Sequence, residues 1–211
     1  MNQHRQAATA PNRLTEQLAY EAARILCEEA ALDYRSAKLK AAQRLGAGNG
    51  ALPDNAEIQA AVIAYQRLYG GREYAERLRA LRATAVRAMH LLAEFRPRLV
   101  GAVASGAITA AHRVQLHGFG EKPEALDLFL ESRGIPYRQD DRGYRYPDGS
   151  EEQVPLARFE AGEVGVDVAM FTDNDLRRLP LSPNDGLPMK RLSLAEAEAL
   201  AALSADQILG E

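Results

Sequence analysis

The sequence predicts an α+β protein, with helices in its N-terminal half and a β-sheet with flanking helices in its C-terminal half. Up to Pro97, apolar residues recur every three to four positions, as in amphipathic helices, and beyond it several segments alternate with a period of two. The charge balance changes at the same place. Residues 1–98 carry 15 Lys and Arg against 10 Asp and Glu, whereas residues 99–211 carry 11 against 19. We therefore expect a flexible tail over 1–12, a helical bundle over 13–96 and an α+β domain over 97–211.

Composition sets limits on the class of protein. With 46% hydrophobic and 26% charged residues, the chain can bury a core and is not a disordered polypeptide. No apolar run approaches the ~20 residues needed to span a bilayer, and the N-terminus lacks the apolar segment of a secretory signal. We expect a cytoplasmic protein with no membrane contact. Cys27, the only cysteine, excludes an internal disulfide, and its helical setting favours a small buried residue over a reactive thiol.

The first helix is expected as one long segment over residues 12–45. Its apolar residues recur every seven positions, at Leu18, Ile25, Leu32 and Leu39. Such a ladder suits pairing with a second helix. It indicates a possible homodimer formed through the N-terminal helices.

Two further helices are expected before Pro97. Asp54 and Glu57 have the spacing of a capping box and predict a helix that ends at Gly70-Gly71. A third helix over 72–95 has an apolar face that runs from Tyr74 to Leu92. Short glycine turns between the helices predict a three-helix bundle. The basic residues alternate with acids along these helices, which favours a solvated face over a surface for nucleic acid.

Period-two patterns and turn residues place the elements of the second half. A helix is expected over 123–133 and another after a capping box at Ser193 and Glu196. The polar residues 139–143 are interpreted as the link of a hairpin, and the proline-rich residues 180–188 as a surface segment. Strands are expected over residues 98–104, 113–119, 135–138, 144–146, 153–159 and 164–171.

The stretch LVGAVASGAITAAHRVQLHGF, residues 99–119, combines an apolar run, two spaced glycines and an alternating segment. It resembles the nucleotidyltransferase superfamily, whose fold is polymerase-beta-like. In that family a strand ends in Gly-Ser, a loop carries a second glycine, and the next strand carries Asp-x-Asp. Gly101 and Gly106 match the two glycines, and Ala102 stands at the serine. The resemblance covers roughly residues 85–195 and extends to a group of uncharacterised bacterial proteins with similar Leu-His and Leu-Ser-Pro-x-Asp-Gly segments.

The resemblance implies a mixed sheet and a cleft for a nucleotide or another phosphorylated small molecule. The family's two aspartates, however, correspond to Arg113 and Gln115. A further carboxylate of the family corresponds to Asp167, with Glu160 as the reserve. Mg²⁺ prefers carboxylate oxygens, whereas arginine offers only cationic donors and glutamine only a neutral amide oxygen. We therefore expect no cofactor and no conventional two-metal catalysis, with Mg²⁺ bound only if the site is less degenerate than these residues indicate.

Strand alternation places Arg113, Gln115 and His117 on one face. These side chains could hold a phosphate without a metal, or the face could be a polar surface that carries an internal ion pair. If the two strands are neighbours, as the resemblance implies, we expect Arg113 to face Asp167 within salt-bridge or one-water reach. The candidates for ligand binding are Gly101, Ser105, Gly106, Arg113, Gln115, His117 and Asp167.

Other catalytic patterns are poorly supported. Ser105 lacks the Gly-x-Ser-x-Gly setting of a nucleophile, and His112 is interpreted as a turn cap because its spacing to His117 does not suit paired zinc ligands. Two classes of function remain open at this point. One is a protein that binds a nucleotide or phosphorylated ligand, and the other is a structural or interaction module that uses its N-terminal helices.

Overall fold

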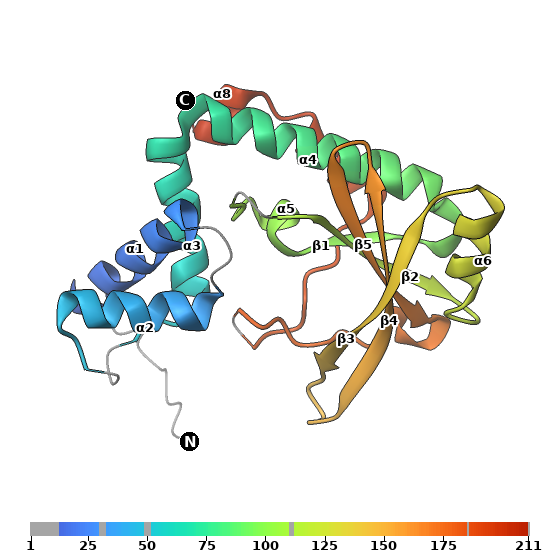
Figure 1. The fold of residues 1–211 in the computed structure, drawn as a ribbon, viewed down its shortest axis with the longest axis horizontal. Coiled ribbons are helices and arrows are strands. Elements are labelled where there is room, and N and C mark those ends of the chain that lie inside the picture. The colour runs from blue at the N-terminus through green and yellow to red at the C-terminus, as the bar shows by residue number, and fades with distance from the viewer. Residues whose placement is uncertain (1–12, 30–32, 49–51, 110–111, 185, 211) are drawn as a thin grey trace, which may run out of the picture.

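The computed structural model describes residues 13–29, 33–48, 52–109, 112–184 and 186–210. Its α+β class confirms the prediction, with helices preceding a sheet (Figure 1). The expected tail over 1–12 lies outside the described residues. The helices are α1 (Arg13–Glu28), α2 (Tyr34–Leu45), α3 (Asn55–Tyr65), α4 (Gly71–Leu91), α5 (Gly101–Ser105), α6 (Ala125–Ser132), α7 (Leu194–Ala201) and α8 (Ala205–Leu209). The strands are β1 (Arg98–Val100), β2 (Val114–Gly120), β3 (Tyr137–Arg145), β4 (Glu151–Ala161) and β5 (Val164–Thr172).

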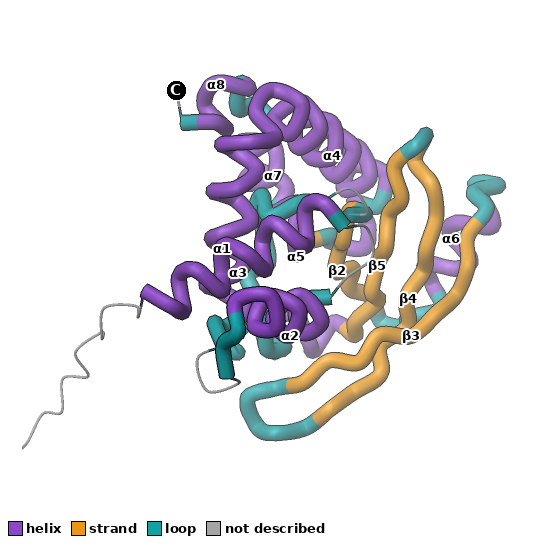
Figure 2. Tube along the Cα trace, turned by 60° about the vertical axis from the view of Figure 1, so that its left-hand side comes forward, coloured by secondary structure: helices purple, strands orange, loops and turns teal. Residues whose placement is uncertain are grey.

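The described strands form a mixed sheet in the order β1-β2-β5-β4-β3. β2 and β5 are parallel, and the other neighbours are antiparallel. Figure 2 shows the twist of this sheet and the long β3–β4 hairpin. One sheet face packs on α4, and α7 and α8 pack on α4 in turn. Val166, Val168 and Met170 are buried in the same core as Leu78 and Met89, with residues of α6, α7 and α8. The opposite face carries a second apolar cluster and a set of polar side chains.

The N-terminal helices have a core of their own. Leu18 and Ile25 of α1 pack with Ile58 and Val62 of α3 and with alanines of α2. The predicted three-helix bundle is wrong, because its third helix, α4, packs against the sheet. A π-helical turn, Gln66–Gly70, joins α3 directly to α4, and Gly71 bends the chain there with a φ of +49°.

The single helix expected over 12–45 is wrong. α1 ends at Glu28, and Asp33 begins α2 by accepting a hydrogen bond from the Ser36 amide at 2.7 Å. An aspartate that accepts from an amide three residues later caps a new helix. Leu39 is consequently 46% exposed, and Leu32 of the same ladder lies outside the described residues. The capping boxes predicted at Asp54 and Ser193 are both confirmed.

Two strand predictions also need correction. β1 ends at Val100, because Gly101, with a φ of +74°, turns the chain into the short helix α5. Residues 139–143 are not a hairpin link, since β3 runs unbroken over Tyr137–Arg145 and pairs with β4 along its length. The hairpin turn follows at residues 146–150.

None of the described helices is both long enough and apolar enough to cross a membrane.

Candidate functional site

The glycine stretch contains the last two residues of β1, the helix α5 and all of β2 except its last residue. A Cβ atom at Gly101 would overlap the Gln115 amide, so this glycine lets Gln115 lie directly over the backbone. Ser105 stabilises the end of α5, donating to the Ala102 carbonyl at 3.2 Å and accepting from the Ala107 amide at 3.3 Å. Gly106 faces α4, where its carbonyl accepts from the Tyr74 hydroxyl at 2.9 Å. The structure therefore brings Gly101 and Gln115 together, and it places Ser105 at the end of α5 and Gly106 against α4.

The predicted pairing of Arg113 with Asp167 is confirmed. Arg113 Nε lies 2.7 Å from Asp167 Oδ1, and Nη1 lies 2.8 Å from Glu160 Oε1. Arg113 also donates from Nη2 to the Phe159 carbonyl at 3.1 Å. Gly165 makes room for this arrangement, since a Cβ atom there would occupy the position of the guanidinium group. Arg113 is thus held mainly by acids and a carbonyl of β4 and β5.

Asp167 is the centre of a cluster of guanidinium groups. Asp167 is only 4% exposed, and its Oδ2 accepts a hydrogen bond from Arg142 Nη2 at 3.1 Å. Arg158 Nε lies 4.0 Å from the same oxygen. A buried carboxylate is stable only when it is paired, and these arginines supply the compensating charge. Arg142 also lines the neighbouring cleft, so it connects the cluster with the cleft.

His117 is buried in a polar chain beside the same cleft. Its Nδ1 accepts from Arg191 Nε at 3.0 Å, and its Nε2 lies 3.1 Å from the Tyr144 hydroxyl. Burial, reinforced by the nearby Arg191 and Arg142 charges, lowers the pKa of His117 well below its ordinary value. The imidazole is therefore neutral at physiological pH.

The remaining predicted residues have local roles. His112 accepts from the Thr109 amide at 2.7 Å through Nδ1, which confirms the predicted turn cap. Burial raises the pKa of the Cys27 thiol to about 11, in keeping with the interpretation as a packing residue. Within the described residues, no group of three or more His, Cys, Asp or Glu side chains is arranged to hold a metal ion.

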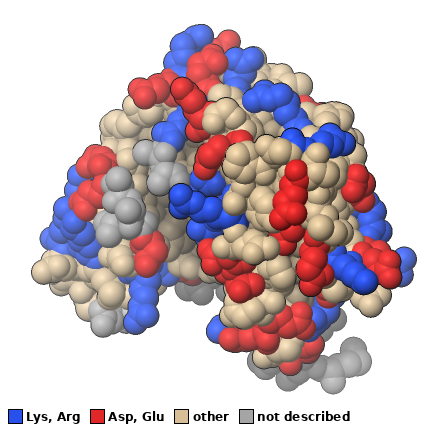
Figure 3. Space-filling model, turned by 45° about the vertical axis from the view of Figure 1, so that its right-hand side comes forward, with Lys and Arg blue, Asp and Glu red and all other residues tan. Residues whose placement is uncertain are grey.

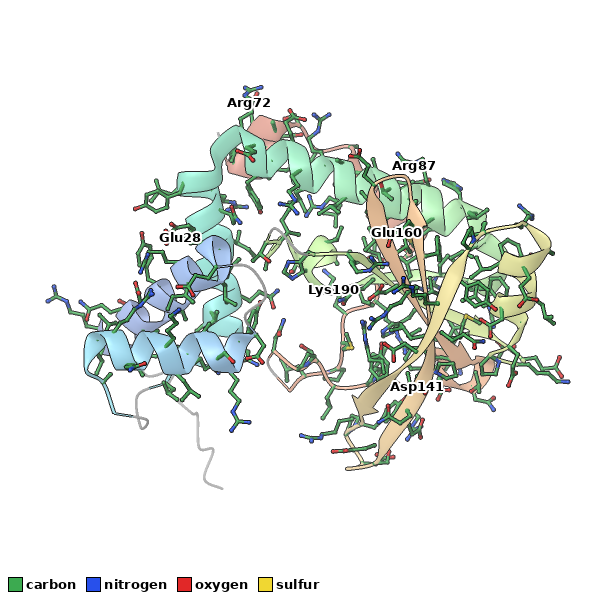
Figure 4. All side chains as sticks on the ribbon, viewed as in Figure 1. Glu28, Arg72, Arg87, Asp141, Glu160 and Lys190 are labelled. Atoms are coloured by element: carbon green, nitrogen blue, oxygen red, sulfur yellow. The ribbon has the colours of Figure 1, made fainter. Side chains whose placement is uncertain are left out.

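A cleft of about 710 Å³ lies between the polar sheet face and residues 181–183, 186 and 189. Its volume is within the range of roughly 300–1,000 Å³ typical of small-molecule sites. Figure 4 places Lys190, which follows this segment, between the N-terminal helices and the sheet. Figure 3 shows that Lys and Arg atoms gather near the middle of one face of the molecule. The lining residues are Val100, Gln115, His117, Arg142, Gly143, Tyr144, Arg145, Glu151, Gln153, Leu181, Ser182, Pro183, Gly186 and Met189.

The proline-rich segment that lines the cleft is hydrogen-bonded to α3. Asn55 at the start of α3 donates a hydrogen bond to the Pro183 carbonyl at 2.7 Å. The side-chain amide of Asn184 donates to Gln59 Oε1. The Leu181 amide donates to the Arg145 carbonyl at 2.7 Å, which ties the same segment to β3. The proline-rich segment therefore connects α3 with β3, a role that its prediction as a surface segment did not include.

The sequence prediction found Gln115 and His117 but missed the contribution of β3. Arg142, Tyr144 and Arg145 line the cleft, yet residues 139–143 were assigned to a turn. The available signal was the alternation of Arg138, Asp140, Arg142 and Tyr144, which places these side chains on one face of a strand. Aspartate and glycine in the middle of the segment obscured it, because both are unfavourable in strands.

Comparison of the chain with protein-family models, with curated proteins and with solved structures gives no match.

Proposed function

We propose that the cleft binds a nucleotide or another phosphorylated small molecule and does not perform conventional metal-dependent nucleotidyl transfer. The observation that carries the proposal is the position of the cleft. It lies on the sheet face that holds Gln115 and His117, where the resemblance implies a ligand, and Arg142 and Arg145 line it as well. Guanidinium groups bind phosphate oxygens through paired hydrogen bonds.

The charges around the cleft are consistent with an anionic ligand. Arg145 pairs with Glu151 at 2.8 Å, but their side chains are 70% and 66% exposed. Exposed pairs contribute at most about 1 kcal/mol, so a phosphate group can compete for this arginine. Arg142 is already oriented by Asp167, and an arginine held in place loses little conformational entropy on binding.

The absence of conventional catalysis is proposed from the residues at the family's acidic positions. Arg113 and Gln115 occupy two of them, and Asp167 is engaged by Arg113 and Arg142. Phosphoryl transfer of the usual kind needs divalent metals held by carboxylates to neutralise the developing charge. A cationic site of this composition favours binding of the phosphate over metal-assisted transfer.

Ligand binding is tested by thermal unfolding with a panel of nucleotides and sugar phosphates, each with and without Mg²⁺ or Mn²⁺. A ligand that binds only the folded protein raises Tm by mass action. We expect Arg142→Gln and Arg145→Gln to reduce this shift, measured from each variant's own Tm. Arg87→Gln removes the same charge from the exposed surface of α4 and serves as the matched control (Figure 4). A panel without any Tm shift would argue against the proposal.

Transferase activity is tested separately with labelled nucleoside triphosphates and Mn²⁺. We expect no transfer of label to the protein, to RNA or to small acceptors. Robust turnover that is lost in Asp167→Ala would show that Asp167 supports metal catalysis, and this part of the proposal would then be wrong.

The second candidate is an interaction module in which the N-terminal helices pair with a second copy of the chain. It is favoured by the exposure of Leu68 and Tyr69, which are 69% and 61% exposed on the π-helical turn. Tyr20 of α1 is bonded to Tyr69 at 2.9 Å and is itself 42% exposed, so it extends the same surface.

A further inference from the structure

A polar chain runs from the half-buried Arg191 through the buried His117 to the buried Tyr144 at the floor of the cleft. These residues come from three separate parts of the fold: the segment before α7, strand β2 and strand β3. His117 and Tyr144 are 1% and 7% exposed, and both line the cleft. Such a chain is costly to bury unless its donors and acceptors match, so its direction can be worked out.

The direction follows from Arg191, because a guanidinium group can only donate. Arg191 Nε is 3.0 Å from His117 Nδ1, so this ring nitrogen must be the acceptor and carries no proton. A neutral imidazole then carries its proton on Nε2. That N–H points to the Tyr144 hydroxyl oxygen at 3.1 Å and donates to it.

This hydrogen bond fixes the role of the Tyr144 hydroxyl. Because its oxygen accepts from His117, its own proton cannot be directed to the imidazole and must find another acceptor. Burial raises the pKa of the Tyr144 hydroxyl, which keeps this proton in place at physiological pH. Tyr144 therefore presents an O–H donor beside Arg142, which shares the lining of the cleft.

The chain is also held rigidly in position. The Arg191 guanidinium lies 4.8 Å from the ring centroids of both Phe119 and Phe171 and donates to the Asp175 carbonyl at 2.7 Å. The His117 ring packs against Phe171 with a centroid separation of 4.6 Å. A donor that is already oriented before binding adds affinity at little cost in entropy.

We propose that the Tyr144 hydroxyl donates a hydrogen bond to a phosphoryl oxygen of the bound ligand, next to Arg142. Arg191 and His117 are positioning residues, which keep Tyr144 in its donor state without touching the ligand. This inference rests on the proposed function and identifies the part of the cleft that receives the anionic group.

The hydrogen-bond direction is tested without a ligand, by long-range proton–nitrogen NMR of the histidine rings. We expect His117 in the wild-type protein to carry its proton on Nε2 only. Arg191→Met should allow both ring tautomers, and Arg191→Lys should restore the single one. A His117 ring with its proton on Nδ1, or on both nitrogens at neutral pH, would contradict the inference.

The phosphoryl contact is tested by calorimetry with inorganic pyrophosphate and ATP. Loss of a hydrogen bond to a charged group is expected to weaken the affinity of Tyr144→Phe about tenfold. Tyr137→Phe is the matched control, because Tyr137 lies on the same strand and bonds to Glu131 at 3.1 Å, outside the cleft. Arg191→Met should lose affinity like Tyr144→Phe, and Arg191→Lys should retain it.

The outcomes separate the two proposals. Equal affinity of Tyr144→Phe and the wild-type protein would overturn the Tyr144 contact and leave the proposed function intact. A wild-type protein that binds neither pyrophosphate nor ATP would overturn the phosphoryl contact and count against the proposed function, whatever the variants do.

Discussion

At the scale of single residues, the contact between Arg113 and Asp167 brings opposite charges together on the polar face of the sheet. The Asp167 side chain is 5% exposed, whereas the Arg113 side chain is 33% exposed, so the carboxylate depends on its partners more than the arginine does. Arg142 offers the same carboxylate a second cation. Removing or reversing a partner of a buried charge is much more costly than changing an exposed pair.

We predict that Arg113→Asp lowers the free energy of unfolding by about 3–5 kcal/mol, because it places a second carboxylate beside Asp167 and Glu160. Urea unfolding measures the change. Arg145→Gln breaks the exposed pair with Glu151 and should cost at most about 1 kcal/mol. If Arg113→Asp is stable and gains Mg²⁺ binding, the cleft is suited to a metal after all, and the argument against metal catalysis fails.

His117 should make stability depend on pH. Burial lowers the folded-state pKa of His117 well below the unfolded value. As the pH falls, the unfolded chain therefore binds a proton at this histidine before the folded protein does. The stability that the neutral His117 ring gives to the folded state is present above the unfolded pKa of about 6.5 and is lost as the pH falls below it.

The measurement is the free energy of unfolding at pH 7.5 and 5.5. We predict that the wild-type protein loses about 1 kcal/mol more over this interval than His117→Gln does. His112 contributes in the same direction, because burial lowers its pKa as well. His90→Gln replaces an exposed histidine and serves as the control. An identical pH dependence in His117→Gln and the wild type would contradict the assignment of a buried, neutral ring.

At the scale of elements, β5 has to combine a buried apolar face with space for the Arg113 side chain. Gly165 and Asp167 lie on one face of β5, and a side chain at 165 would collide with the guanidinium group. We predict that Gly165→Ala separates Arg113 from Asp167 and destabilises the protein more than a glycine-to-alanine change in an open strand would. Combining Gly165→Ala with Arg113→Ala tests this, since the double variant should be less destabilised than the sum of the two single ones. Strict additivity would mean that the two positions are independent.

The elements also show why part of the site was predictable. Period-two alternation put Arg113 and Asp167 on matching faces of their strands, and the resemblance supplied the expectation that these strands are neighbours; β2 and β5 do pair in parallel, so their faces coincide. The same rule did not find Arg142, since Asp140-Asp141 and Gly143 favour a turn locally. Pairing of β3 with β4 over nine residues overrides that preference, and such long-range pairing is not visible in a short window.

The break between α1 and α2 has a similar origin. A heptad ladder through Leu18 and Leu39 predicts one helix, but Asp33 and Ser36 form an N-cap inside it. Folding α2 back onto α1 buries Ala37 and Ala41 against the α1 surface. Tertiary packing therefore outweighs continuation of the helix, and the residue that marks the break is a single polar one.

At the scale of the whole molecule, the N-terminal lobe, which consists of α1, α2, α3 and the π-helical turn, has exposed apolar side chains that are relevant to oligomer formation. Leu39 and Leu45 of α2 are 46% and 45% exposed, and Leu68 and Tyr69 are more exposed still. Single exposed hydrophobic residues are common on monomers, whereas a contiguous apolar patch marks an interaction surface. Leu68 and Tyr69 are adjacent, and Tyr20 extends them through its hydrogen bond to Tyr69. A second copy of the chain presents the same residues in a twofold interface.

We predict a homodimer that forms through the N-terminal lobe, measured by light scattering after gel filtration at micromolar concentrations. Leu68→Glu should shift the protein to the monomer, because it places a charge in the apolar contact. Leu128→Glu is the matched control, since Leu128 is 67% exposed on α6, outside the N-terminal lobe. A wild-type protein that stays monomeric across this range would remove the dimer. A dimer unaffected by Leu68→Glu would instead place the interface elsewhere on the molecule.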